Sequence, residues 1–241
     1  MVAAIVLAGG LGTRLRAAVP DLPKPMAPVA GRPFLEHQLD HWIGQGVQRF
    51  VLSVGYRSEA IRAHFGDAYR GVPVDYAVET TPLGTGGGVL LGAALLPPGE
   101  SFLLLNGDTF FDVALDRLRA FHRANAASLT FSLFRTTETG RYMGMDVNGD
   151  GRIAALRSGS ASPGRLANGG VYWVDPAALR DLPWKPGDRL SFEDDLVPAV
   201  LAGGGRLYGL ECAGRFIDIG IPGDYRRAAS VLTAVPSVEE L

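Results

Sequence analysis

The sequence predicts a three-layer α/β fold, in which strands that alternate with helices form one sheet. An apolar run at residues 2–7 is typical of a strand that is buried on both faces. Strand and helix patterns then alternate through residue 112. After the helix pattern of Leu115–Ala124, an Asn-Gly-Asp-Gly hairpin signal at residues 148–151 indicates a smaller β-rich part.

The separate elements follow from apolar runs, apolar stripes and turn residues. A short helix is expected after Ser58 as its N-cap, and Ser191 should cap another helix. The remaining strands are expected at residues 50–54, 74–78, 102–105, 129–134, 143–147, 152–156, 166–174, 206–210 and 215–217. The remaining helices are expected at residues 33–46, 89–96, 176–181, 192–202 and 223–232.

Composition narrows the function classes. The 241 residues carry a formal net charge of −2, which gives no electrostatic reason to expect nucleic acid or an anionic membrane as a partner. No apolar run is long enough to predict a membrane span, and no basic N-terminal region predicts a signal peptide. Cys212 is the single cysteine, which excludes an internal disulfide or zinc framework and favours a reducing, cytoplasmic location.

A glycine-rich segment follows the first strand. Glycines allow a sharp turn and bring backbone N–H groups close to an anion, while a hydroxyl and a guanidinium suit phosphate oxygens. The spacing matches neither the dinucleotide-binding fingerprint nor a P-loop. The segment therefore predicts a nucleotide phosphate site of another kind, with an ordinary strand–helix turn as the alternative. Its residues are Leu7, Ala8, Gly9, Gly10, Leu11, Gly12, Thr13 and Arg14.

Lys24 lies between two prolines, Pro23 and Pro25, which hold it in a stiff segment. A lysine fixed in this way can place its charge at one point beside the phosphates. The alternative is an ordinary solvated lysine in a loop.

A second glycine-rich segment, residues 79–88, opens the helix expected at residues 89–96. Free N–H groups at a helix N-terminus favour an anion or a polar base edge. Because ligands of α/β sheets bind beyond the carboxyl ends of the strands, both glycine segments are expected to border one nucleotide site. A tight strand–helix turn is the alternative. The candidate contacts are Glu79, Pro82, Leu83, Gly84 and Thr85.

Two carboxylates follow apolar strands at the same expected edge of the sheet. Asp108 comes after residues 102–105 through Asn106 and Gly107, and Asp218 follows residues 215–217. A carboxylate in such a place needs a compensating charge, which Mg²⁺ shared with a nucleotide would supply. The alternative is that each aspartate only shapes a turn.

Two other acidic motifs are assigned no chemistry. Residues 146–151 begin like a calcium loop, but its twelfth position holds Arg157 where glutamate is required, so a plain hairpin turn is expected. The acidic triplet Glu193, Asp194 and Asp195 lies in the first turn of an expected helix, where it complements the helix dipole.

Together these motifs resemble the sugar-1-phosphate nucleotidyltransferases along nearly the whole chain. The similarity rests on residues 7–14, 23–25, 82–86, 106–108 and 218–222, in that order. Residues 105–112, Leu-Asn-Gly-Asp-Thr-Phe-Phe-Asp, are especially similar to the D-glycero-D-manno-heptose 1-phosphate guanylyltransferases.

The resemblance implies one domain over residues 1–241, a Rossmann-like three-layer mixed sheet of the nucleotide-diphospho-sugar transferase type. Residues 1–112 would form the nucleotide-binding core. Residues 113–241 would add a smaller β-rich sugar-binding insertion, a closing metal-binding strand and a C-terminal helix. No left-handed β-helix acyltransferase domain is expected.

The family's roles carry over to the matching residues. The first glycine segment would hold the triphosphate of GTP or another nucleoside triphosphate. Arg14, Lys24 and Asp108 would be catalytic, and Asp108 and Asp218 would hold Mg²⁺, the expected cofactor. The second substrate would be a sugar 1-phosphate, and the oligomeric state stays open, a homo-oligomer included. The residues implied for the sugar pocket are Tyr142, Gly144, Asn168 and Gly169.

Glu79 stands three positions before Pro82, where the family commonly has a residue that reads the base. Guanine presents two adjacent donors, N1–H and the N2 amino group, and one carboxylate can accept both. Uracil and thymine present a donor beside acceptors, which an amide suits better. Glu79 therefore favours GTP, with a solvated glutamate at a strand end as the alternative.

One difference from the family pattern leaves more than one sugar 1-phosphate as a candidate substrate. Many relatives carry a Glu-Lys pair after the second hairpin strand, where this chain has Leu-Arg-Ser-Gly at residues 156–159. Arg157 or Arg165 is the candidate to hold the sugar phosphate. The expected sugar is D-glycero-α-D-manno-heptose 1-phosphate, with mannose 1-phosphate or another hexose 1-phosphate as the alternative.

Two rival functions are disfavoured. A dehydrogenase would need the dinucleotide-binding fingerprint that the first glycine segment lacks. A non-catalytic subunit that senses a sugar nucleotide should have lost a metal ligand or a phosphate-binding cation. This chain keeps all four of the residues in question, Arg14, Lys24, Asp108 and Asp218.

Overall fold

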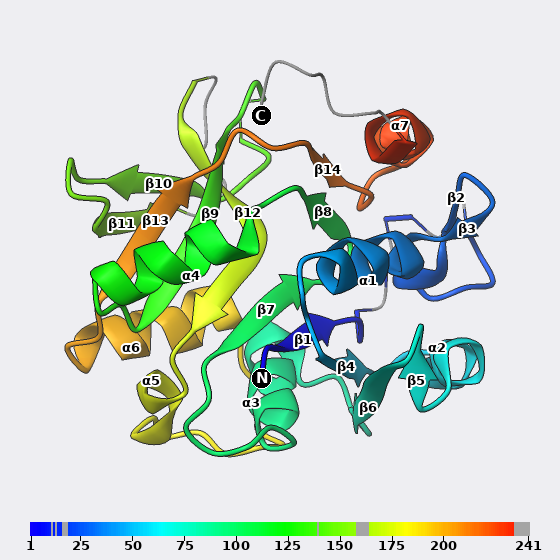
Figure 1. The fold of residues 1–241 in the computed structure, drawn as a ribbon, viewed down its shortest axis with the longest axis horizontal. Helices are drawn as coiled ribbons and strands as arrows, with labels where there is room; N and C mark the ends of the chain where they lie inside the picture. Colours follow the sequence, from blue (N-terminus) through cyan, green and yellow to red (C-terminus); the bar gives the residue numbers. More distant parts are fainter. Residues whose placement is uncertain (11, 13, 16–18, 139, 158–163, 234–241) are drawn as a thin grey trace.

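The computed structural model describes residues 1–10, 12, 14–15, 19–138, 140–157 and 164–233. Within these residues, ten strands form one sheet in the order β11-β10-β12-β7-β1-β4-β6-β5, with β9 and β13 continuing from β12 (Figure 1). The strands are β1 (Ala3–Leu7), β4 (Arg49–Val54), β5 (Ala68–Tyr69), β6 (Val72–Val78), β7 (Phe102–Asn106), β9 (Leu129–Arg135), β10 (Gly144–Val147), β11 (Ile153–Arg157), β12 (Leu166–Val174) and β13 (Leu207–Glu211).

β1 lies inside the sheet, between two parallel neighbours. It pairs with β4 on one side and β7 on the other, and β4 pairs in parallel with β6. The direction reverses at β12, which runs antiparallel to β7 with Val171 opposite Leu105. The expected mixed α/β fold is therefore confirmed, and a strand from the second half of the chain completes the sheet of the first.

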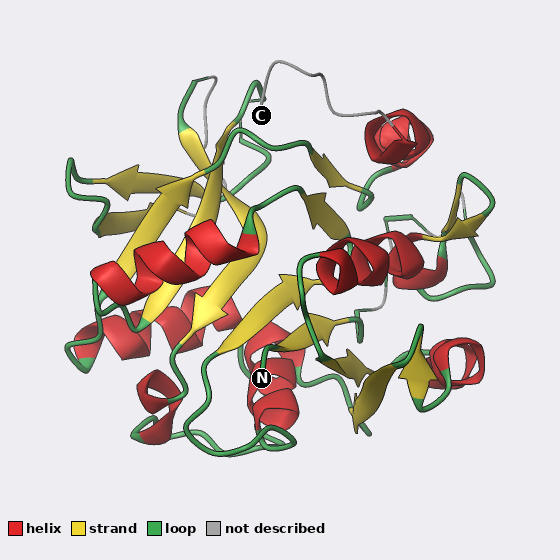
Figure 2. Ribbon diagram, viewed as in Figure 1, coloured by secondary structure: helices red, strands yellow, loops and turns green. Residues whose placement is uncertain are grey.

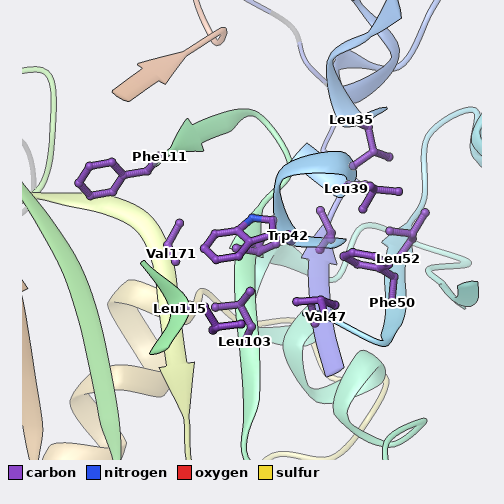
Figure 3. Close-up of a cluster of buried hydrophobic side chains, with 14 of the residues drawn as sticks. Leu35, Leu39, Trp42, Val47, Phe50, Leu52, Leu103, Phe111, Leu115 and Val171 are labelled. Carbon is purple, nitrogen blue, oxygen red and sulfur yellow. The ribbon is translucent and has the colours of Figure 1, made fainter. Parts of the chain in front are cut away.

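Helices cover both faces of this sheet (Figure 2). Along β1, Ala4 and Val6 belong to one apolar cluster and Ile5 to the other, because successive side chains of a strand point to opposite faces. Figure 3 shows the first cluster, with Trp42 over the sheet. No helix in the described part of the chain is long and apolar enough to cross a membrane. The first face carries α1 (Phe34–Gly44), α2 (Ser58–Phe65) and α4 (Leu115–Ala124), and the second carries α3 (Gly84–Ala93), α5 (Ala177–Arg180) and α6 (Val197–Ala202).

A third apolar cluster joins α7 (Pro222–Thr233) to a two-stranded ladder of β8 (Thr109–Phe111) and β14 (Phe216–Asp218). A further small ladder, β2 (Pro28–Val29) and β3 (Arg32–Pro33), precedes α1. In the β8–β14 ladder Thr109 lies opposite Asp218, and the N–H of Ile219 donates to the carbonyl oxygen of Asp108 at 3.0 Å. Backbone pairing therefore holds the two distant aspartates side by side.

The two expected serine caps have different outcomes. Ser58 is the first residue of α2 and caps nothing, because Arg57 occupies the N-cap position with a positive φ of 52°. Ser191 does act as a cap, since its Oγ accepts a hydrogen bond from the N–H of Asp194 at 3.0 Å. The helix that it caps begins with one π-helical turn, Phe192–Leu196, before α6.

His122 of α4 makes the stability of the fold depend on pH. It is buried against β9, with Nδ1 2.9 Å from Thr130 Oγ1, and burial lowers its pKa from 6.5 to about 4. Below pH 6.5 the unfolded chain therefore binds a proton that the folded chain excludes, and the free energy of unfolding falls as the pH drops.

We expect His122→Gln to remove about 1 kcal/mol of the stability lost between pH 7 and pH 5, because glutamine does not titrate. Denaturant unfolding of both proteins at the two pH values measures this difference. Equal losses in the wild type and the variant would contradict the prediction.

Candidate active site

Two clefts adjoin at the ends of β1 and β7, and they share Asn106 and Asp108. The first has a volume of about 290 Å³ and the second about 300 Å³. The first is lined by Leu7, Ala8, Gly9, Gly10, Lys24, Pro25, Glu79, Pro82, Gly84, Thr85, Asn106, Gly107 and Asp108. The second is lined by Asn106, Asp108, Thr109, Arg141, Tyr142, Met143, Asn168, Gly170, Glu193, Asp194, Phe216 and Asp218.

The first glycine segment forms one wall of the first cleft. It is held at its base by two backbone hydrogen bonds, from the N–H of Ala8 to Ser53 and from the N–H of Gly107 to Leu7. Arg14 is exposed and is absent from the described linings of both clefts. Leu11 and Thr13, which the sequence also assigns to the phosphate site, lie outside the described residues.

Lys24 has a largely buried side chain, so the alternative of a solvated loop residue is wrong. It begins a short 3₁₀ turn after Pro23, and its side chain is only 10% exposed. Its Nζ forms an ion pair with the Asp108 carboxylate and lies 3.9 Å from Oδ1 of Asp218. The chain passes close to Gly12, where φ is +58° and an added Cβ would lie 3.1 Å from Cβ of Lys24.

Asp218 is the more buried of the two aspartates. Its Oδ1 accepts a hydrogen bond from the N–H of Gly220 at 2.6 Å, and its carboxylate faces Lys24 and Arg141. Burial raises the pKa of Asp218, and the charge of Asp108 raises it further, while Lys24 opposes both effects. The two carboxylates therefore repel each other, and Lys24 lies between them as a counter-charge.

This donor set suits Mg²⁺ that is also bound by a nucleotide. Among the residues that the structure describes, no group of three or more His, Cys, Asp or Glu side chains could hold a metal ion by itself. Mg²⁺ needs no such cage, because it is usually held by one or two carboxylates together with substrate phosphates. Asp108 and Asp218 offer two hard oxygen donors beside the first cleft.

Glu79 lines the first cleft and is held in place by two donors. Ser53 Oγ donates to Oε1 at 3.2 Å, and the N–H of Leu83 donates to Oε2 at 3.0 Å. A carboxylate has about four acceptor sites, so both oxygens can still accept further hydrogen bonds. Glu79 is thus a fixed acceptor in the cleft wall, not a freely solvated side chain.

The second glycine segment is not the open loop that the sequence suggests. Its glycines lie within α3, and the N–H groups of Gly86 and Gly87 donate to the carbonyl oxygen of Leu190 at 3.0 and 3.3 Å. These two N–H groups are therefore not available to a phosphate or a base. The glycines permit close packing instead, because an added Cβ on Gly86 would lie 2.9 Å from the backbone of Ser191.

The second cleft contains part of the expected sugar pocket. Tyr142 and Asn168 line it. Gly144 is buried in β10, and a Cβ on Gly169 would run into the ring of Phe111, so neither is among the described lining residues. Gly170 lines the cleft in place of Gly169.

A comparison with protein families finds one whose match covers the residues of both clefts. Residues 3–234 match the family of nucleotidyl transferases. The chain belongs to that family.

Curated relatives of this nucleotidyl transferase include proteins named D-glycero-alpha-D-manno-heptose 1-phosphate guanylyltransferase. The protein of Aneurinibacillus thermoaerophilus is 39% identical over 95% of this chain and 97% of its own. The protein of Campylobacter jejuni is 34% identical over 92% and 96%. The crystal structure of HddC from Yersinia pseudotuberculosis, complexed with GMP-PN, superposes with a TM-score of 0.82 and 31% identity over 95% of this chain and 99% of that one.

Three charged residues of this nucleotidyl transferase line the second cleft without having been predicted as site residues, namely Arg141, Glu193 and Asp194. Arg141 lies 3.5 Å from Asp218 Oδ2 and also forms ion pairs with Glu138 and Asp224. Glu193 accepts a hydrogen bond from Thr85 Oγ1 at 3.0 Å. The only sequence signal for Glu193 was the acidic triplet, and Arg141 had none beyond its place before a predicted sugar contact.

Of the two arginines that the sequence proposed for the sugar phosphate, the structure disfavours Arg165 and leaves Arg157 untested. Arg165 is exposed, forms an ion pair with Asp146 on the neighbouring hairpin and is not among the described residues of the cleft. The side chain of Arg157 lies outside the described residues. Among the described residues, Arg141 is the arginine that lines the cleft.

Proposed function

We propose that this nucleotidyl transferase transfers GMP from GTP to D-glycero-α-D-manno-heptose 1-phosphate, giving GDP-heptose and pyrophosphate. The observation that carries the proposal is the pair of clefts that meet at Asp108, beside Lys24 and Asp218. One cleft suits a nucleotide and the other a phosphorylated sugar. The two bacterial heptose 1-phosphate guanylyltransferases at 39% and 34% identity support this choice of substrates.

The reaction needs no general base in this site. The nucleophile is a phosphate oxygen of the sugar 1-phosphate, which is already ionised near neutral pH. It forms a bond to the α-phosphorus of GTP, while the bond from that phosphorus to the β-phosphate oxygen breaks and pyrophosphate leaves. The protein must therefore bring two polyanions together and stabilise the developing charge.

The positive groups of the site fit that task. Lys24 lines the first cleft beside Asp108, and Arg141 lines the second. Arg14 lines neither cleft in the described structure, and its proposed contact with the phosphates of the nucleotide rests on the family resemblance. Asp108 and Asp218 would hold Mg²⁺. When bound, Mg²⁺ would neutralise charge on the phosphates of the nucleotide and help to orient them.

A substrate panel tests the proposed function. The purified protein is incubated with GTP, ATP, UTP or dTTP and with heptose, mannose or glucose 1-phosphate, and pyrophosphate release is measured with and without Mg²⁺. We expect the highest kcat/KM with GTP and heptose 1-phosphate, and no release without the metal. Release that depends on neither the sugar nor the metal would contradict the proposal.

Mannose 1-phosphate is the second candidate substrate. The Mannose-1-phosphate guanylyltransferase of Mycobacterium tuberculosis is 34% identical over 95% of this chain, which spans 64% of that protein. A mannose-specific enzyme would show its highest kcat/KM with mannose 1-phosphate in the same panel, still with GTP.

We assign to Glu79 the recognition of guanine, and with it the preference for GTP. Glu79→Gln keeps the size of the side chain but replaces one acceptor oxygen by a donor, which clashes with the donor edge of guanine. We expect the preference for GTP over UTP and dTTP to fall by at least about 10-fold, the effect of one hydrogen bond to a charged group. Competition between the nucleotides in the pyrophosphate assay measures this ratio.

Glu59 of α2 is an exposed glutamate and supplies the matched control. Glu59→Gln should leave the preference unchanged. A Glu79→Gln enzyme that discriminates as well as the wild type would remove Glu79 from base recognition.

A further inference from the structure

Glu193 is turned toward the second cleft and anchored from two sides. It belongs to the π-helical turn Phe192–Leu196, and such turns often occur at functional sites. Thr85 Oγ1 donates to its Oε2 at 3.0 Å, and the hydroxyl of Tyr172 donates to its Oε1 at 3.5 Å. A solvated residue that only complements a helix dipole would need neither contact.

The contacts of Glu193 extend to the predicted sugar contact Asn168. The hydroxyl of Tyr172, which is fully buried, accepts a hydrogen bond from Nδ2 of Asn168 at 2.8 Å. Oδ1 of Asn168 in turn accepts from the N–H of Gly170 at 3.1 Å. Because Tyr172 has one hydroxyl hydrogen and directs it to Glu193, the orientation of the Asn168 amide is fixed.

The segment that carries Glu193 is also fixed to the first cleft. Thr85 lines that cleft, and its Oγ1 accepts a hydrogen bond from the N–H of Phe192 at 2.8 Å while donating to Glu193. The N–H groups of α3 that bond to Leu190 hold the same segment. The carboxylate therefore keeps its position before any substrate binds.

The negative charge of Glu193 determines which part of a sugar 1-phosphate it can bind. A carboxylate repels a phosphate but accepts hydrogen bonds from hydroxyl groups. The cations Lys24 and Arg141 are held by other partners, Asp108, Asp218, Glu138 and Asp224. Burial raises the pKa of Glu193, and the neighbouring charge of Asp194 raises it further, while the hydrogen bond from Thr85 lowers it.

We propose that Glu193 is a specificity-determining residue that accepts a hydrogen bond from a ring hydroxyl of the sugar 1-phosphate. The proposal rests on the function proposed above and names a residue that selects the sugar.

The test compares Glu193→Gln with the wild type on the accepted sugar 1-phosphate and on its 2-deoxy, 3-deoxy and 4-deoxy analogues. We expect kcat/KM for the parent sugar to fall about 10- to 100-fold, as for the loss of one hydrogen bond to a charged group, with KM for GTP unchanged. One deoxy analogue should give equal kcat/KM with both enzymes, because it lacks the hydroxyl that Glu193 binds.

Asp195→Asn is the matched control, since Asp195 lies in the same turn, is exposed, and its carboxylate accepts only the N–H of Ser191 among its described contacts. It should behave as the wild type. Tyr172→Phe is a second test if Glu193→Gln folds poorly. It removes the hydroxyl that orients Glu193, so it should weaken the contact between Glu193 and the sugar without changing KM for GTP. An equal loss on all analogues, or no loss, overturns the assignment of Glu193, whereas a wild type that uses no sugar 1-phosphate overturns the proposed function itself.

Discussion

Replacing Lys24 with alanine should lower the rate of pyrophosphate release at least about 100-fold, the usual effect of losing one preorganised electrostatic partner. The side chain is 10% exposed and its ammonium group pairs with Asp108 within reach of Asp218. In the variant these two carboxylates face the phosphates of both substrates without that charge. The loss should appear in kcat at saturating Mg²⁺, because the lysine acts on the developing charge.

The chain offers an unusually close control for this experiment. Lys185 is the other lysine of the sequence, is also followed by a proline, and is exposed. Lys185→Ala should leave kcat unchanged. Thermal unfolding of both variants shows whether loss of the Lys24 ion pair also destabilises the fold. A Lys24→Ala enzyme with near-normal kcat would place Lys24 outside the mechanism.

The elements that the sequence predicts well are those with long apolar patterns. The helix Leu115–Ala124 and the strand Leu166–Val174 have the predicted bounds. The β8–β14 ladder was predicted only in part, because its strands are three residues long and β8 has no period of its own. Pairing between Thr109 and Asp218 defines that ladder, and no local pattern contains such a contact.

The same distinction applies to the site. Lys24, Asp108 and Asp218 could be found because prolines or buried strands fix the backbone around them. Glu193 could not, because the helix dipole already explains an acidic first turn, and its direction depends on Thr85 and Tyr172 from distant elements.

The sequence singled out the glycines at residues 84–88, but the role that it assigned to them was wrong. Three glycines in a row normally weaken a helix and suggest a loop. Here they begin α3, and a Cβ on Gly88 would lie 2.8 Å from Ser53 Oγ of the sheet. Their absent side chains allow the helix, the sheet and the Leu190 segment to meet beside the first cleft.

Asp218→Asn should lower the rate at least about 100-fold at ordinary Mg²⁺ concentrations, since it removes one of two proposed metal-binding charges. Asparagine preserves the local fold, because its amide oxygen can still accept the hydrogen bond that Gly220 donates at 2.6 Å. A rate titration with Mg²⁺ at fixed GTP should show that the variant requires a higher metal concentration for half-maximal activity.

Asp112 provides the comparison for this variant. It follows β8 in the same ladder, away from the clefts, and forms an ion pair with Arg215 at 3.2 Å. Asp112→Asn should keep both the rate and the Mg²⁺ dependence of the wild type. If Asp218→Asn lost rate without any change in Mg²⁺ dependence, Asp218 would act by holding Lys24 and Arg141 in place, and the metal would have to bind through Asp108 and the nucleotide alone.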